Sequence, residues 1–129
     1  MNTSELTRGQ VERTISQRIQ ALYRERLGHQ PSKVTCELFE DKLTIVLENS
    51  ITPAEQLLLQ EGKEDSVEQL RSDLDEVIRP QLKAELEEIL GISVLDLLSD
   101  ATLETGRMGL IAVLESAPSL RSGSRKNRG

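Results

Sequence analysis

Few side chains in this 129-residue sequence have the types and spacing that catalysis needs. Ser99, His29 and Asp100 supply a nucleophile, a base and an orienting acid, the set that serine hydrolases use. Their spacing does not support that chemistry, because no Gly-x-Ser-x-Gly turn surrounds Ser99 and His29 belongs to a separate loop. A Ser-Asp pair after a strand is more typical of a turn. We therefore expect a protein that is not an enzyme.

The metal-binding residue types are also scarce. Cys36 and His29 are the single cysteine and the single histidine, too few for a Cys/His zinc site within one chain. Cys36 alternates with Val34 and Leu38, which predicts an inert thiol on an apolar strand face. The acidic residues of the second half have the spacing of a solvated helix face: Asp73, Asp75, Glu76, Glu85, Glu87 and Glu88. We expect no metal and no cofactor.

One short segment, SITPAEQLLLQEG (residues 50–62), predicts a capped helix and offers a candidate binding site. Thr52 and Glu55 have the spacing of a capping box, and Pro53 stands at the first helical position. The free N–H groups of such a helix start can bind an anion such as bicarbonate or phosphate. Pro53 removes one donor and Glu55 repels anions, so the pattern favours a cap. The candidate anion or partner contacts are Thr52, Glu55, Leu58 and Leu59.

The charge and hydropathy of the chain limit the classes of partner that it can bind. The net charge is −6, and setting aside Arg121, Arg125, Lys126 and Arg128 of the tail leaves residues 1–115 at −10. An acidic body disfavours nucleic acid, and four positive charges without an apolar anchor bind nucleic acid or an anionic membrane only weakly. No signal-peptide pattern opens the chain, and no run approaches the roughly 18 apolar residues of a membrane span. We expect a cytoplasmic protein without direct membrane insertion.

The first half of the chain predicts a helix followed by a hairpin. Thr7 and Gln10 form a capping box, and an apolar stripe with helical spacing follows until Gly28 and Pro31: Val11, Ile15, Ile19 and Leu22. The period then changes to two over residues 33–39 and 43–48, which indicates a β-hairpin.

The second half predicts a long helix and two further strands. Asp65 is the expected cap of the helix, which runs to Gly91, and Pro80 should kink it near Val77 or break it in two. Strands are expected at 92–98 and 108–115, with a mobile loop over 99–107 between them. Residues 1–6 should fray, and the basic tail 116–129 should be disordered.

Together these elements predict one α+β domain over residues 7–115. It has a four-stranded, mostly antiparallel sheet in α-β-β-α-α-β-β order, with helices packed on one face. The last strand is apolar on both sides, which is typical of a strand buried on both faces. A second copy of the chain is the expected cover, so we predict a homodimer whose contact face includes Ile111, Val113 and Leu97.

The central region, about residues 7–115, resembles a family of small bacterial proteins called MpsC-like, after a component of a sodium-translocating, membrane-potential-generating system. The resemblance rests on LYRERLGHQPSKV, LTIVLENSITPAEQLLLQEG, EEILGISVLDLLSD and a closing VLE, with marks at Gly28, Pro31, Thr52, Pro53, Glu55, Gly62 and the Ser99-Asp100 pair. The basic tail departs from the family pattern.

The resemblance implies a cytoplasmic protein whose relatives are sometimes encoded beside membrane subunits for inorganic-carbon uptake and proton or sodium movement. It supplies no catalytic residues. The expected function is a non-enzymatic, dimeric accessory or regulatory protein that docks on a membrane-protein complex for ion or inorganic-carbon transport. The alternative is a small-anion or metabolite sensor domain.

Overall fold

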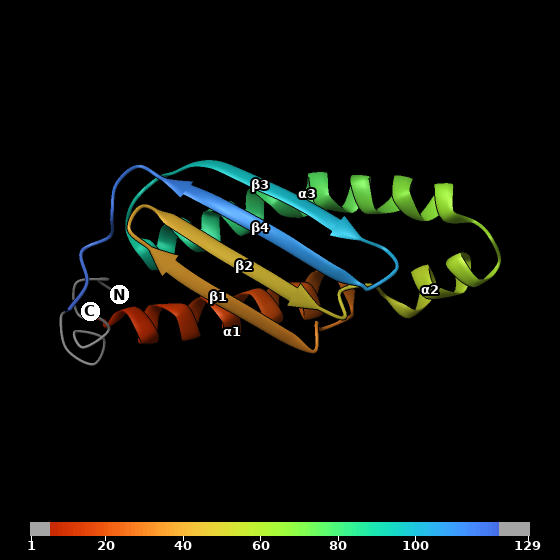
Figure 1. Cartoon of the computed structure of the whole chain (residues 1–129), viewed down its shortest axis with the longest axis horizontal. Coiled ribbons are helices and arrows are strands. Elements are labelled where there is room, and N and C mark those ends of the chain that lie inside the picture. Colours follow the sequence, from red (N-terminus) through yellow and green to blue (C-terminus); the bar gives the residue numbers. More distant parts are fainter. Residues whose placement is uncertain (1–5, 122–129) are drawn as a thin grey trace.

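The computed structural model describes residues 6–121 of the chain. Its elements are α1 (Arg8–Leu27), β1 (Lys33–Phe39), β2 (Lys42–Glu48), α2 (Pro53–Gln60), α3 (Glu64–Leu90), β3 (Val94–Thr102) and β4 (Arg107–Leu114). The strands form one antiparallel sheet, and Figure 1 shows α1 and α3 on its far side and α2 beyond one end. The predicted α+β fold and element order are confirmed.

The strand order is β1-β2-β4-β3, so each hairpin places one strand at the centre and one at an edge. The two hairpins join through β2 and β4, where Ile45 lies opposite Leu110 and Leu47 opposite Met108. These residues face the helices and are buried, as is the apolar stripe of α1. The core therefore lies between the inner face of the sheet and the two long helices, as binary patterning requires.

The two predicted capping boxes are present. Thr7 Oγ1 accepts from the Gln10 N–H at 3.2 Å while Gln10 Oε1 accepts from the Thr7 N–H at 2.8 Å, which fixes the start of α1. Gly28 ends α1 with φ of 70°, a conformation that glycine adopts without strain. The same pattern at Thr52 and Glu55 starts α2.

Helix α3 differs from the sequence expectation at its start, and of the two outcomes expected at Pro80 it does not show the break. It begins at Glu64 after Lys63, which makes no side-chain cap, so the predicted cap at Asp65 is wrong. The tight turn from α2, in which the Lys63 N–H donates to the Leu58 carbonyl at 2.8 Å, determines the start. The helix also continues through Pro80 without a break. Burial of Ile78 and Leu82 on either side offsets the donor that proline lacks.

Strand β3 is longer than predicted and contains a bulge. Residues 99–102, expected in a mobile loop, pair with β4 instead, and only 103–106 form the turn. Ser99, Asp100 and Thr102 are polar, which an edge strand tolerates, and Ala101 packs against the core. The pairing slips between Val94 and Asp96, which leaves Leu95 as an extra residue. This slip reverses the faces of all later residues in β3.

Both ends of the described chain make contacts. The Arg121 N–H donates to the Leu6 carbonyl at 2.8 Å, Pro118 is buried, and Leu120 packs against the core. Leu6 and residues 116–121, which belong to the segments predicted to fray or to be disordered, therefore contact the rest of the described chain. The rest of those two predicted segments, 1–5 and 122–129, lies outside the described residues.

Candidate functional site

The predicted contact at the start of α2 is occupied by its own side chains. The Glu55 carboxylate accepts from the Thr52 N–H and from the Thr52 hydroxyl, both at 2.9 Å. In return Thr52 Oγ1 accepts from the Glu55 N–H at 3.2 Å. A carboxylate therefore already stands where a bound anion would have to sit.

Glu55 is also fully buried, and its partner is Arg71 of α3. Arg71 Nη1 lies 3.1 Å from Glu55 Oε2, and the same guanidinium donates to the Ser50 carbonyl at 3.3 Å. Ser50 in turn donates its hydroxyl proton to the Gly106 carbonyl at 2.9 Å. This network ties α2, α3 and the β3–β4 turn together, so Glu55 and Thr52 hold the fold at this end. Nothing in the sequence paired Glu55 with Arg71.

Two of the three leucines of α2 are partly buried, and the third is exposed. Leu58 and Leu59 are partly buried, and Leu59 lines a hollow of about 270 Å³ against the β3–β4 turn. Leu57 is the exposed one. Leu58 and Leu59 therefore hold α2 in place at least in part, and Leu57 is the leucine most open to a partner.

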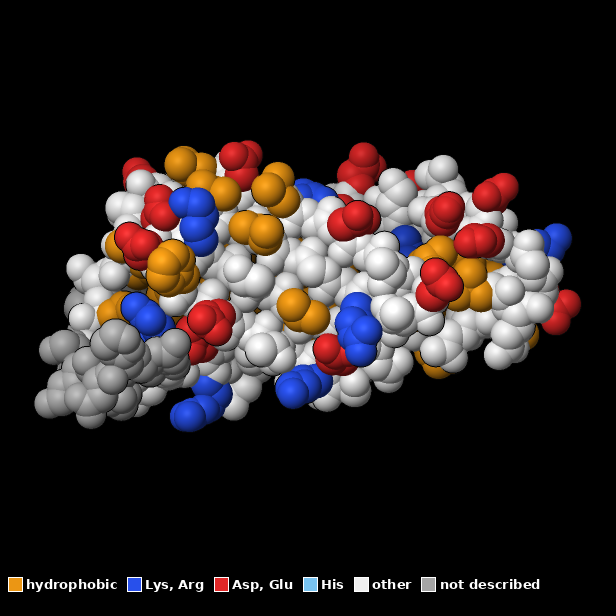
Figure 2. Space-filling view, viewed as in Figure 1, with side chains coloured by type: hydrophobic (Ala, Val, Ile, Leu, Met, Phe, Trp, Pro, Cys, Tyr) orange, Lys and Arg blue, Asp and Glu red, His pale blue; other side chains and the backbone are white. Residues whose placement is uncertain are grey.

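The second candidate is the open face of the sheet, the side away from α1 and α3. The pairing places Lys42, Val113 and Asp96 in one row across this face and Thr44, Ile111 and Leu98 in the next. Phe39 lies opposite Lys42 at the edge. Figure 2 shows hydrophobic side chains gathered over one half of this side of the molecule, with charged ones around them.

We call Phe39, Leu98, Ile111 and Val113 the apolar patch. Phe39 is 62% exposed, Leu98 56% and Ile111 44%, while Val113 is partly buried. Ile111 and Val113 were predicted for this face. Leu97 was too, but it lies opposite Ala112 and packs against the core, because the bulge at Leu95 reverses the alternation. Leu98 lies on the open face instead, opposite Ile111. This exchange of Leu97 for Leu98 could be recognised only once the bulge was known.

A third feature was not predicted: a cavity of about 510 Å³ between α3, the end of α1 and the β3–β4 hairpin. One stripe of α3 with helical spacing faces it, comprising Glu64, Glu68, Arg71, Asp75 and Ile78. Across from this stripe the wall includes Tyr23, Met108 and Glu104. The volume falls in the range of small-molecule sites.

Tyr23 is the most deeply buried polar group of this wall. It is 3% exposed, and its hydroxyl donates to the Met108 sulfur at 3.4 Å, a weak acceptor. Burial is the main cause that raises the pKa of Tyr23 to about 12. The phenol is therefore neutral at physiological pH, and among the described residues none donates a hydrogen bond to its oxygen.

The residues considered for hydrolysis do not meet. Ser99 Oγ accepts from Arg79 at 2.7 Å and lies 3.4 Å from Asp75, whereas His29 bonds to the Asn49 carbonyl in another loop. Asp100 caps the neighbouring Ala101 N–H.

Cys36 donates to the Glu12 carbonyl at 3.2 Å, and burial raises the pKa of its thiol to about 12, in keeping with the predicted inert thiol. Within residues 6–121, no group of three or more acidic, His or Cys side chains is placed to hold a metal.

Comparison with known proteins gives one finding. Neither the curated proteins nor the solved structures contain a match to this chain. In residues 6–121 no helix has the length and apolar character to cross a bilayer. The family described as "Na+-translocating membrane potential-generating system (MpsC)" matches residues 7–116, nearly the whole described chain. The chain therefore belongs to the MpsC family.

Proposed function

We propose that this protein is a dimeric, non-enzymatic accessory or regulatory component of a membrane system that moves sodium ions or inorganic carbon, acting from the cytoplasmic side. The family description supports the link to a sodium-translocating system. The observation that carries the dimer is the apolar patch, which no helix of the described chain covers.

A second copy of the chain suits this face. Lys42 and Asp96 lie on either side of Val113 in one row, so two copies related by a two-fold axis can place opposite charges against each other across the interface. The patch itself would supply the apolar centre that a stable interface needs. Docking on the membrane subunits is then left to other surfaces, among them α2 with its exposed Leu57.

Light scattering on the purified protein tests the dimer. Ile111→Glu places a charge at the centre of the patch and should convert a dimer to a monomer. Leu57→Glu is the matched control, because it adds the same charge at an exposed aliphatic side chain on α2, outside the patch, and should leave the dimer intact. A monomeric wild type, or a dimer that survives Ile111→Glu, would contradict the proposed interface.

The transport role needs a measurement in cells. Cells lacking the protein should build a smaller sodium-dependent membrane potential, followed with a potential-sensitive dye, and the wild-type chain should restore it. An unchanged potential in those cells would contradict the role, whatever the oligomeric state.

A further inference from the structure

We propose that the cavity between α3 and the β3–β4 hairpin binds a small organic cation, an ammonium or guanidinium group on a hydrocarbon frame. This site goes beyond the proposed function and does not rest on the dimer, because the apolar patch lies on the opposite face of the sheet.

The charges around the cavity determine whether it favours a cationic or an anionic ligand. Arg71 and Arg79 are positive, but each is paired within the chain, Arg71 with Glu55 and Arg79 with Asp75. Glu64, Glu68 and Glu104 line the cavity, and none of them is in an ion pair with another described residue. Figure 2 shows acidic side chains over the end of the molecule that holds α2 and the first half of α3. An anion entering here would be repelled, and a cation attracted.

The interior wall adds an apolar surface and one acceptor. Leu27, Ile78 and Met108 line the cavity, so a hydrocarbon frame can be removed from water there. The buried Tyr23 hydroxyl uses its proton on Met108, which leaves its oxygen able to accept a hydrogen bond from an ammonium group. The two arginines of this region, Arg71 and Arg79, both donate to carboxylates, so their positive charges are already compensated within the chain.

Tyr23 also provides a local signal for binding. It is the only tyrosine, and the chain has no tryptophan, so intrinsic fluorescence reports on this wall alone. Three six-carbon probes of the same frame separate charge from shape: 1,6-diaminohexane, 1,6-hexanediol and adipate. Titrated at constant ionic strength, the diamine should change the Tyr23 emission saturably and raise Tm, and the diol and adipate should do neither. Equal responses to all three probes, or none to the diamine, would overturn the proposal.

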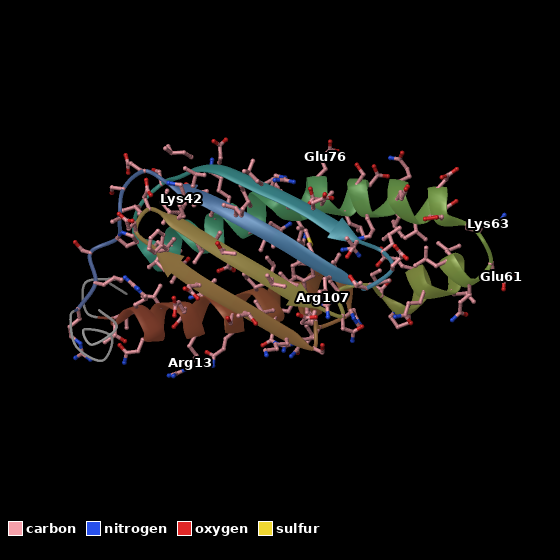
Figure 3. All side chains as sticks on the ribbon, in the orientation of Figure 1. Arg13, Lys42, Glu61, Lys63, Glu76 and Arg107 are labelled. Atoms are coloured by element: carbon pink, nitrogen blue, oxygen red, sulfur yellow. The ribbon has the colours of Figure 1, made fainter. Side chains whose placement is uncertain are left out.

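Variants then locate the binding. Glu64→Gln and Glu68→Gln should each raise the Kd of the diamine about threefold, and the double variant about tenfold, the size expected for exposed charge pairs. Glu76→Gln is the matched control on the same helix, since Glu76 is exposed, is outside the cavity wall and points away from the sheet in Figure 3. An equal effect of Glu76→Gln would mean that the diamine only screens an acidic surface, which would overturn the site.

Two further measurements distinguish the cation site from the proposed dimer and from binding of a basic peptide. The Ile111→Glu variant should bind the diamine as the wild type does, so failure of the dimer and failure of the cation site are distinguishable. A synthetic peptide of residues 119–129 carries the basic cluster of the tail. If this peptide bound while the diamine did not, the occupant would be a basic peptide segment, and the small-cation proposal would be overturned.

Discussion

The carboxylate of Glu55 caps α2 and pairs with Arg71 while it is wholly enclosed by protein. A buried charge is tolerated only where hydrogen bonds and an opposite charge compensate for lost hydration, and Glu55 has both. Other ion pairs among residues 6–121 are more exposed, such as Arg107 with Glu48 at 2.8 Å. Figure 3 shows Arg107 at one end of the sheet, far from Lys42 at the other. The two kinds of pair should respond differently to the loss of their arginine.

Arg71→Met should lower the free energy of unfolding by about 3 kcal/mol, because it leaves the buried Glu55 charge without its partner. Arg107→Met should cost at most about 1 kcal/mol, since its pair is solvated. Urea denaturation followed by circular dichroism measures both. The double variant Arg71→Met with Glu55→Gln should regain part of the loss, because the uncompensated charge is then removed. Equal losses for the two arginines would contradict this account of Glu55.

The buried Tyr23 predicts how the stability of the protein changes at alkaline pH. Its folded pKa of about 12 lies above the ordinary value of 10, because burial disfavours the phenolate. The unfolded chain therefore releases this proton first as pH rises. Stability from Tyr23 is complete below pH 10 and is lost between pH 10 and about 12, by up to about 3 kcal/mol. Tyr23→Phe should lack this loss, so the difference between wild type and variant in alkaline urea titrations isolates it. Parallel decline of the two proteins above pH 10 would show that Tyr23 is not responsible.

Among the elements, those with local signals were predictable from sequence and those set by distant contacts were not. Thr7 and Thr52 mark helix starts because a capping box needs only four consecutive residues. The start of α3 at Glu64 depends on hydrogen bonds within the preceding turn, and no residue there has the capping side chain that would announce it. Of the kink or break predicted at Pro80, the break does not occur, because burial of the flanking turns keeps α3 continuous.

The bulge at Leu95 shows why the alternation of side chains along a strand is not enough to predict which residues share a face of the sheet. In the sequence of β3 apolar residues stand at both alternating positions, and the extra residue turns Leu97 inward and Leu98 outward. Ile111 and Val113 were placed correctly because β4 has no such slip. The cavity was missed for a similar reason: its walls come from α1, α3 and the β3–β4 hairpin, and only the tertiary fold brings them together.

Across the molecule as a whole, the apolar core is distributed unevenly. The second half of α3 buries Ile78, Leu82, Leu86, Ile89 and Leu90, whereas its first half buries only Val67. In α2 the one buried residue is Glu55, so α2 is held largely by a polar network and partial leucine contacts. The end of the molecule that contains the cavity therefore has little buried apolar area, and local opening should be easiest there.

Hydrogen exchange followed by mass spectrometry should show this gradient. Amides of β2 and β4 should exchange only through global unfolding, since both strands are central in the sheet and their inner faces are buried. Amides of α2 and of residues 64–74 should exchange through smaller openings, because few buried apolar contacts have to be broken. Arg71→Met should accelerate exchange in α2 more than in the sheet, since it removes the ion pair between α2 and α3. If α2 and β4 instead exchanged at one common rate in the wild type, the polar network would be as strong a link as the core. The end that holds the cavity would then be rigid before any ligand binds.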